Sequence, residues 1–224
     1  MRDDKMQRII LVGSAITEDE LLDKIEPDDE VWSLNNLYGQ FPNVKFTRWF
    51  ELHTFKRSRN GYLRRGQDTY WNKRILDYMK DIDKLDIPVM MQKQWKVIKK
   101  SEVFPFEEIM QKHGNYFGCS FAWMIAYLLE NYSPLDYIVR FDGISLNSYE
   151  YYYQRPSTEY MLGIMVGKGY GITIGTTSSL TREPYIYAYK EDYEVIDFLH
   201  VGFIRDLTTA IVSSITRYFV DDKT

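Results

Sequence analysis

The feature that most constrains the fold is a short apolar run near the start of the chain that ends in small turn-forming residues. Arg8 to Val12 (RIILV) is continuously apolar after its first residue, which is typical of a strand buried on both faces, and Gly13-Ser14-Ala15 follows it. Thr17 and Glu20 then have the spacing of a helix capping box. We therefore predict a strand, a tight turn and a helix from about Glu18 to Ile25.

Strand-like and helix-like segments continue to alternate along the chain. The other predicted strands are Val31 to Leu34, Val44 to His53, Pro88 to Met91, Tyr137 to Phe141 and Gly169 to Ile174. The other predicted helices are about Asp68 to Lys84, Glu107 to Lys112, Phe121 to Glu130, Ser157 to Lys168 and a closing helix at about 206–219. This alternation predicts an α/β fold: an open, mostly parallel, Rossmann-like sheet of five to six strands with helices on both faces.

Length and composition bound the class of protein. The chain has 224 residues, of which 45% are hydrophobic, so we expect residues 1–224 to form a single domain with a full core. Its net charge of −4 disfavours general nucleic-acid binding. The single cysteine, Cys119, excludes an internal disulfide and a multi-cysteine metal site. Neither a membrane-spanning stretch nor a signal peptide is evident, and we expect a cytoplasmic location.

Every predicted strand ends in small or polar residues. Open α/β sheets bind ligands beyond the carboxyl ends of their strands, near the point where the strand order reverses. The strand ends in question are Gly13-Ser14, Asn35-Asn36, Glu51 with His53, Asp142-Gly143 and Thr176-Thr177-Ser178. We interpret this repetition as a nucleotide site; simple turn formation is the alternative.

Two of these strand ends have the chemistry to bind parts of a nucleotide. Gly13 and Ser14 open a helix whose free N–H groups favour an anion, although no GxGxxG or P-loop pattern is present. Asn35 and Asn36 offer amide donors and acceptors to a base or to ribose hydroxyls. In both cases a turn-forming role is the alternative.

A second anion site is predicted before the buried helix. Gly118, Cys119 and Ser120 lie at the expected N-terminus of that helix, where the helix dipole favours negative charge. Arg155 can bind a phosphate or carboxylate with two parallel hydrogen bonds. Cys119 has no assignable histidine partner, which argues against a role as nucleophile.

Acid–base and metal chemistry have one candidate each. Alternation along a strand places Glu51 and His53 on the same face, where the carboxylate can orient the imidazole for general base catalysis. Asp142, followed by Glu150 and Glu159, is the candidate ligand for Mg²⁺ against phosphates. A structural histidine and a solvated acidic loop are the respective alternatives.

The stretch from 55 to 67 is strongly basic and aperiodic, and we predict a loop there. Its cations are Lys56, Arg57, Arg59, Arg64 and Arg65. Such a loop can clamp a polyanionic ligand or partner, or it can simply be solvated.

Several segments carry a family resemblance. VWSLNN with TRWFELH, then YFGCSFAWMIAYLL, then YIVRFDGISL with EYYYQRPSTEYMLG, resemble bacteriophage and bacterial Rossmann-like proteins. The same layout is similar to the 6-hydroxymethylpterin pyrophosphokinase-like family and, distantly, to Rossmann-like bacterial sialyltransferases. The resemblance spans about Ile9 to Ile174. It implies a nucleotide site, at the positions Gly13, Ser14, Asn35, Asn36, Gly118, Cys119, Ser120 and Asp142, and a host cytoplasm for a phage-encoded chain.

These observations predict a nucleotide-binding transferase that moves a glycosyl or phosphoryl group from an activated nucleotide such as a nucleotide sugar. One alternative is a protein of the phage type that binds a nucleotide or signalling metabolite without turnover. A second is a protein-interaction scaffold that uses the tyrosine-rich run 149–153, which also leaves a homo-oligomer open. The sequence leaves the cofactor open beyond Mg²⁺ as a candidate.

Overall fold

The computed structural model describes residues 6–57, 63–65, 75–147 and 154–182. Its backbone contacts divide the chain into two units, Met1–Thr181 and Arg182–Thr224. Almost all of the second unit, including the closing helix expected at 206–219, lies outside the described residues. The fold below is that of the first unit, and the single-domain organisation stays a prediction.

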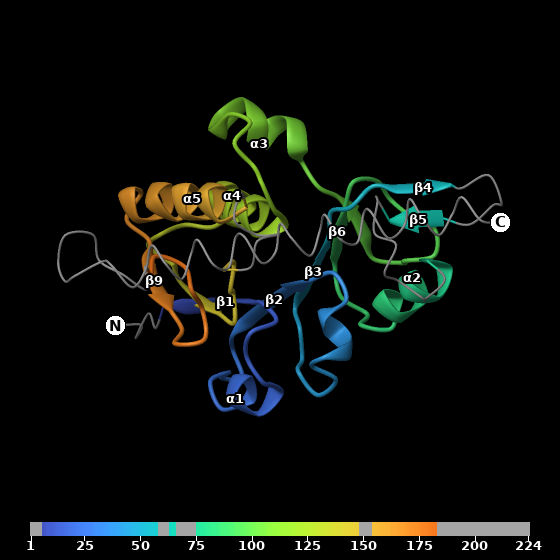
Figure 1. Cartoon of the computed structure of the whole chain (residues 1–224), viewed down its shortest axis with the longest axis horizontal. Helices are drawn as coiled ribbons and strands as arrows, with labels where there is room; N and C mark the ends of the chain where they lie inside the picture. The colour runs from blue at the N-terminus through green and yellow to red at the C-terminus, as the bar shows by residue number, and fades with distance from the viewer. Residues whose placement is uncertain (1–5, 58–62, 66–74, 148–153, 183–224) are drawn as a thin grey trace, which may run out of the picture. The chain divides into compact units, whose positions relative to one another are not determined.

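Seven parallel strands form one open sheet, which confirms the predicted Rossmann-like α/β class with slightly more strands than expected (Figure 1). The strands are β1 (Gln7–Val12), β2 (Glu30–Leu34), β3 (Arg48–Glu51), β6 (Val89–Met91), β7 (Ser101–Val103), β8 (Tyr137–Asp142) and β9 (Gly171–Ile174). Their order is β7-β6-β3-β2-β1-β8-β9, and every neighbouring pair is parallel. The order reverses between β1 and β8, because the chain builds one half of the sheet from β1 to β7 and then crosses to β8.

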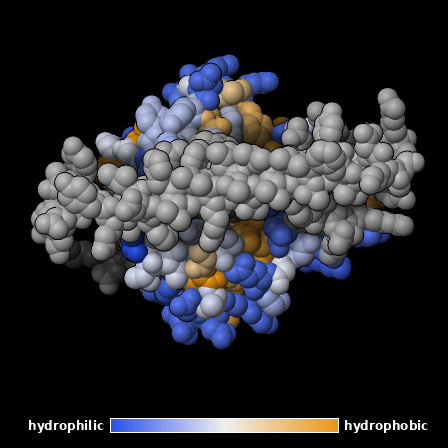
Figure 2. Space-filling view, viewed as in Figure 1, coloured by the Kyte–Doolittle hydropathy of each residue, from blue (hydrophilic) through white to orange (hydrophobic). Residues whose placement is uncertain are grey.

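Helices cover both faces of this sheet, as predicted (Figure 1). One face packs against α1 (Glu18–Leu22), the 3-10 turn η1 (Leu37–Gly39) and α2 (Ile75–Asp83), and the other against α3 (Phe106–His113), α4 (Ser120–Asn131) and α5 (Arg155–Gly167). Successive strand residues fill opposite cores: Trp49 belongs to the α1–α2 side and Phe50 to the α3–α5 side, and both are fully buried. In Figure 2, hydrophilic residues gather over α1 and α3.

Local sequence explains the two helices that were predicted most specifically. The capping box of α1 is present: Thr17 Oγ1 accepts from Glu20 N at 3.3 Å, and Glu20 Oε2 accepts from Thr17 N at 3.1 Å. The helix ends at Leu22, three residues earlier than predicted. The apolar helix α4 is buried along most of its length, since it fills the space between the sheet and its neighbouring helices.

Three segments differ from the prediction. The strand expected from Val44 to His53 is only Arg48–Glu51, because Val44 and Phe46 enter the core from an irregular segment that makes no strand ladder. The edge strand β7 was not predicted. Within the expected basic loop, β4 (Phe55–Arg57) and β5 (Leu63–Arg65) form a separate two-stranded antiparallel sheet.

No helix in the described ranges is both long and apolar enough to cross a bilayer.

Candidate functional site

The point where the strand order reverses is filled by backbone. Gly13 N donates to Asp142 O and Ala15 N donates to Gly143 O, each at 2.8 Å, so the turns after β1 and β8 are joined directly. A Cβ at Gly13 would lie against the Gly143 carbonyl, with Ile144 Cα only 2.9 Å away. Two of the N–H groups that follow β1 are thus already satisfied within the protein.

The helix after this turn does not present an open anion site. Its five residues begin with Glu18, Asp19 and Glu20, and the capping box occupies the N–H groups of Thr17 and Glu20. Carboxylates near a helix N-terminus stabilise the helix, but they would repel a phosphate. Gly13 and Ser14 lie at the expected edge of the sheet, and their role in binding phosphate stays a prediction.

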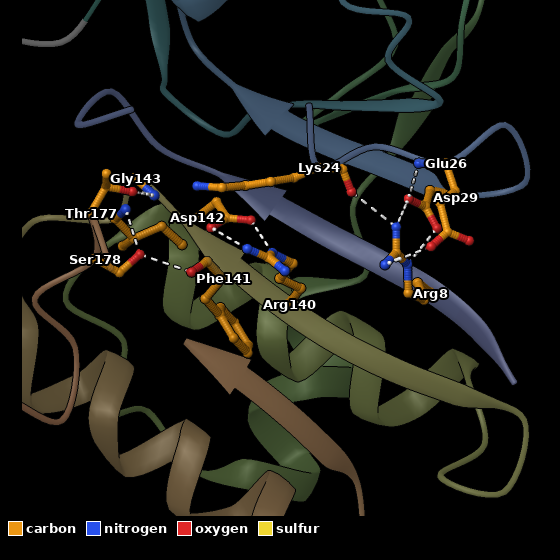
Figure 3. A network of polar contacts seen from close by, with 11 residues as sticks. Arg8, Lys24, Glu26, Asp29, Arg140, Phe141, Asp142, Gly143, Thr177 and Ser178 are labelled. Atoms are coloured by element: carbon orange, nitrogen blue, oxygen red, sulfur yellow. Dashed lines mark hydrogen bonds and ion pairs between the residues drawn. The ribbon is translucent and has the colours of Figure 1, made fainter. Parts of the chain in front are cut away.

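Asp142, the candidate metal ligand, is engaged in an ion pair (Figure 3). Its fully buried carboxylate accepts from Arg140 Nε through Oδ2 and from Arg140 Nη2 through Oδ1, the latter at 3.3 Å. A Cβ at Gly175 would overlap Asp142 Oδ1, so the backbone that directly follows β9 closes over this carboxylate. Among the residues that the structure describes, no three His, Cys, Asp or Glu side chains gather as a metal site. The geometry therefore favours a structural role for Asp142 over the predicted Mg²⁺.

The turn after β9 holds the end of β8 in place (Figure 3). Thr177 Oγ1 accepts from Gly143 N at 3.1 Å, and Ser178 Oγ accepts from Ile144 N at 3.0 Å. Ser178 Oγ also donates to Phe141 O at 2.8 Å. The hydroxyl groups of Thr177 and Ser178, which were expected to line a ligand site, instead satisfy the neighbouring backbone.

A second network in Figure 3 lies toward the other end of β1. Arg8 Nε donates to Asp29 Oδ1 at 2.8 Å, and Arg8 Nη2 donates to Lys24 O at 3.0 Å. The hydrogen bond to Asp29 raises the pKa of the Arg8 guanidinium. This network fixes the connection between α1 and β2 and contributes nothing to the carboxyl edge.

Asn35 contains a buried polar atom at this edge for which the described part of the chain provides no partner. Its backbone adopts a positive φ of 58°, Asn35 N donates to Phe50 O at 3.0 Å, and Asn35 O accepts from Trp49 Nε1 at 3.1 Å. Its side-chain Oδ1 is buried and accepts no hydrogen bond from any described residue. Such an acceptor costs about 1–3 kcal/mol. Asn36, by contrast, is exposed.

Glu51, His53 and Tyr78 form the most specific constellation at the carboxyl edge. Glu51 is the last residue of β3 and its side chain is fully buried; its Oε1 lies 2.6 Å from His53 Nδ1. The hydroxyl of Tyr78, on α2, donates a hydrogen bond to Glu51 Oε2. The predicted Glu51–His53 pair is present, and a third member, Tyr78, joins it from 27 residues further along the chain.

This arrangement can support proton transfer. A carboxylate that accepts from Nδ1 fixes the imidazole tautomer and makes Nε2 the basic nitrogen. The His53 side chain keeps 35% of its surface exposed, whereas the carboxylate behind it has none. A buried carboxylate, an oriented imidazole and access from solvent are the parts that general base catalysis needs.

Gly118, Cys119, Ser120 and Arg155 lie together at the N-termini of α4 and α5. Gly118 N donates to Ser157 Oγ at 2.9 Å, and Cys119 Sγ lies 3.0 Å from Thr158 Oγ1, so the two helix starts are bonded to each other. Cys119 is the N-cap of α4 and its side chain makes no capping hydrogen bond.

Arg155 is held in place by two neighbouring side chains. Arg155 Nε donates to Glu159 Oε1 at 2.8 Å, and Nη1 donates to Asn147 Oδ1 at 3.2 Å. Residues 148–153, including Glu150, lie outside the described part of the chain. The predicted site residues at the carboxyl edge thus form two groups. Asn35, Glu51 and His53 form one, and Gly118 to Ser120 with Arg155 form the other, on the α3–α5 side of the sheet.

A shallow pocket of about 710 Å³ lies elsewhere, at the C-terminal ends of α3, α4 and α5. Within this pocket, Glu130 accepts a hydrogen bond from Lys112 Nζ and lies 2.8 Å from Nε2 of the largely buried His113. Burial opposes ionisation of Glu130, but the hydrogen bonds from Lys112 and His113 outweigh it and lower its pKa. Basic residues at helix C-termini complement the helix dipoles, which explains this cluster without a ligand.

In comparisons with protein-family models, curated proteins and solved structures, nothing matches this chain. The class that the fold defines is an open parallel α/β protein of Rossmann-like type.

Proposed function

We propose that this protein is a nucleotide-binding transferase that moves a glycosyl or phosphoryl group from an activated nucleotide, with His53 as the general base. The observation that carries the proposal is the Glu51–His53–Tyr78 constellation at the carboxyl end of β3. Glu51 orients the imidazole, and the Tyr78 hydroxyl holds Glu51. The imidazole then takes the proton from the acceptor hydroxyl as the acceptor oxygen bonds to the transferred glycosyl or phosphoryl group. The bond between that group and the nucleotide phosphate breaks at the same time, and the nucleotide leaves with the electron pair.

The remaining predicted residues supply the binding part of the proposal. Asn35 Oδ1, at the neighbouring strand end, would accept a hydrogen bond from an N–H or O–H group of the nucleoside. Gly118 to Ser120 and Arg155 are the candidates for phosphate on the other side of the sheet. Positioning and charge stabilisation would supply most of the rate, and no step depends on a metal at Asp142. The proposed setting is the cytoplasm.

One observation favours a second candidate, a protein that binds a nucleotide or signalling metabolite without turnover. Arg140 pairs with both oxygens of Asp142, and backbone acceptors satisfy the N–H groups of Gly13 and Ala15. Much of the edge is therefore built for rigidity rather than for chemistry. The scaffold alternative rests on residues 149–153, which lie outside the described part of the chain.

A thermal-shift screen tests the proposal. The panel contains nucleotides, nucleotide sugars, dinucleotides and cyclic nucleotides, each with and without Mg²⁺. A ligand at 100 times its dissociation constant should stabilise the protein by about 2.7 kcal/mol. Product formed from the bound compound supports the transferase; binding without product supports the second candidate. If no class of compound raised the unfolding temperature, both the transferase and the binding protein would be overturned.

A further inference from the structure

The residue proposed as the base lies beyond the end of its strand. β3 ends at Glu51 and β4 begins at Phe55, so residues 52–54 belong to neither strand. The last registered pair of β3 and β6 is Glu51 with Met91. Sheet pairing therefore does not position His53, and side chains must do so. One of them is Glu51, whose Oε1 accepts from His53 N at 3.2 Å in addition to its contact with Nδ1.

A second side chain, Gln92, contacts the residues on either side of His53. Gln92 directly follows β6, which ends at Met91. Its Nε2 donates to Leu52 O at 2.9 Å, and its Oε1 accepts from Thr54 Oγ1 at 3.1 Å. Both distances are those of ordinary hydrogen bonds. One amide group thus binds both sequence neighbours of the candidate base.

The sheet register explains why Gln92 can make both bonds. Because Glu51 pairs with Met91, Leu52 and Gln92 occupy the next position of each chain. The backbone oxygen of Met91 accepts from Phe104 N at 2.8 Å and so bonds toward the β7 side. A glutamine side chain has a donor and an acceptor, as a peptide group does. The Gln92 side chain therefore continues the pairing with residues 52–54 after the strands have ended.

The orientation of the Gln92 amide follows from its partners. A carbonyl oxygen can only accept a hydrogen bond, so the amide nitrogen must face Leu52 O, and the amide oxygen is left for the Thr54 hydroxyl. Thr54 and Gln92 are both exposed, and water competes for such groups, so their bond adds little to stability. Its main consequence is the geometry of the residue between Leu52 and Thr54.

We infer that Gln92 is a positioning residue for His53: together with Thr54 it holds the backbone on both sides of His53, so that the imidazole keeps its contact with Glu51. The effect on turnover rests on the proposed function, whereas the effect on the imidazole does not. A displacement of about 1 Å in a reacting group can lower a rate by about 10²-fold, which makes such support important for a base that lies outside a strand.

The first test measures the tautomer of His53 in the full-length protein without any ligand. Nitrogen-15 NMR distinguishes Nδ1–H from Nε2–H imidazoles among the three histidines, and the signal that is lost in His53→Ala identifies His53. In mildly alkaline buffer we expect His53 to be in the Nδ1–H form, since Glu51 accepts from Nδ1. In Gln92→Met, which keeps the side-chain length but lacks the amide, this form should give way to a mixture of both tautomers.

The control variants separate the hydrogen bonds from the surface change. Gln94→Met alters an equally exposed glutamine two residues further on and should leave His53 unchanged. Thr54→Val removes the hydroxyl at nearly constant volume and should act like Gln92→Met, whereas Thr54→Ser keeps the hydroxyl and should preserve the wild-type tautomer. An unchanged His53 tautomer in Gln92→Met or in Thr54→Val would overturn the inference.

His113 provides an internal reference in the same spectra. Its Nε2 lies 2.8 Å from Glu130 Oε1, so we expect the Nε2–H form in the wild type and in every variant. A change shared by His113 would show a general effect on the fold rather than on the position of His53, and it would also overturn the inference.

The second test measures turnover, with UDP-glucose as the probe for glycosyl transfer and ATP as the probe for phosphoryl transfer. For a probe that the wild type converts to UDP or ADP, Gln92→Met should keep the affinity within a few fold and lower the turnover by about 10²-fold. Full turnover in Gln92→Met would overturn the inference even if the tautomer changes. If the wild type releases neither UDP nor ADP, the result counts against the proposed function, and the tautomer alone decides the inference.

Discussion

The hydroxyl of Tyr78 on α2 donates a hydrogen bond to Glu51 at the end of β3, and so connects the helix to the carboxylate that orients His53. Both side chains are buried, so the bond forms in a region where an unpaired carboxylate oxygen would be costly. The stability of the fold and the alignment of the candidate base thus depend on the same contact.

Tyr78→Phe should lower the free energy of unfolding by about 1–3 kcal/mol, because it removes a donor from a buried charge and leaves the packing in place. Urea denaturation measures this change. Tyr160→Phe is the matched control, since Tyr160 is half-exposed on α5, and it should stay within about 0.5 kcal/mol of wild type. Equal effects of the two substitutions would show that the Tyr78 hydroxyl contributes nothing.

Gly13→Ala should destabilise the protein by about 1–3 kcal/mol or more, because the added Cβ meets the backbone of Gly143 and Ile144, which cannot rotate away. Gly163→Ala provides the comparison. Nothing lies within 4 Å of a Cβ at Gly163, in the interior of α5, so alanine there should stabilise by about 0.5–1 kcal/mol. Thermal unfolding of both variants measures the contrast; a stable Gly13→Ala would contradict the close contact between the β1 and β8 turns.

Arg140→Met should lower the free energy of unfolding by about 3–5 kcal/mol, because it removes the arginine that pairs with the fully buried Asp142 carboxylate. Asp142→Asn should cost less, because Arg140 is partly exposed and can be solvated. Denaturant titration ranks the two variants by their free energy of unfolding. A larger loss in Asp142→Asn than in Arg140→Met would contradict a structural ion pair. In the same titrations Mg²⁺ should leave wild-type stability unchanged. A Mg²⁺ effect that disappears in Asp142→Asn would instead support the metal site predicted from the sequence.

The fold could be predicted where local pattern decides it. The β1 run, the Thr17–Glu20 capping box and the apolar α4 each combine composition with periodicity, and each is present. The strands β4, β5 and β7 were missed because three-residue strands made mostly of polar residues exist only through their pairing partners, which lie elsewhere in the sequence.

The candidate site could be predicted only in part. Alternation along the predicted strand placed Glu51 beside His53, and the two side chains do meet, although His53 lies two residues beyond the end of β3. The same rule applied to β8 would have placed Arg140 on the same face as Asp142, where the two side chains pair. Tyr78 lies within the helix predicted from about Asp68 to Lys84, where nothing in the sequence marked its hydroxyl as part of a site. Its hydrogen bond to Glu51 is a tertiary contact, and periodicity carries no information about which polar group meets a buried phenol.

The stabilising effect of Glu130 should depend on pH. Burial opposes ionisation of Glu130, but the hydrogen bonds from Lys112 and His113 outweigh it and lower the pKa of Glu130 in the folded state. The carboxylate therefore stabilises the protein above its unfolded pKa of about 4.5. That contribution is lost as the pH falls through the lower, folded value. The free energies of unfolding of wild type and Glu130→Gln should therefore differ by about 1–3 kcal/mol near pH 6 and converge as the solution becomes more acidic. A constant difference across this range would contradict the assignment.

The most direct test of His53 as the general base is to measure binding and turnover together in His53→Ala, with the ligand that the thermal-shift screen identifies. Titration calorimetry gives the affinity, and mass spectrometry of the products gives the rate. We predict that the variant keeps wild-type affinity within a few fold while its turnover falls by about 10²–10⁴-fold. Unchanged turnover in His53→Ala would contradict the role of His53, and a wild-type protein that binds the ligand without forming any product would contradict the transferase itself.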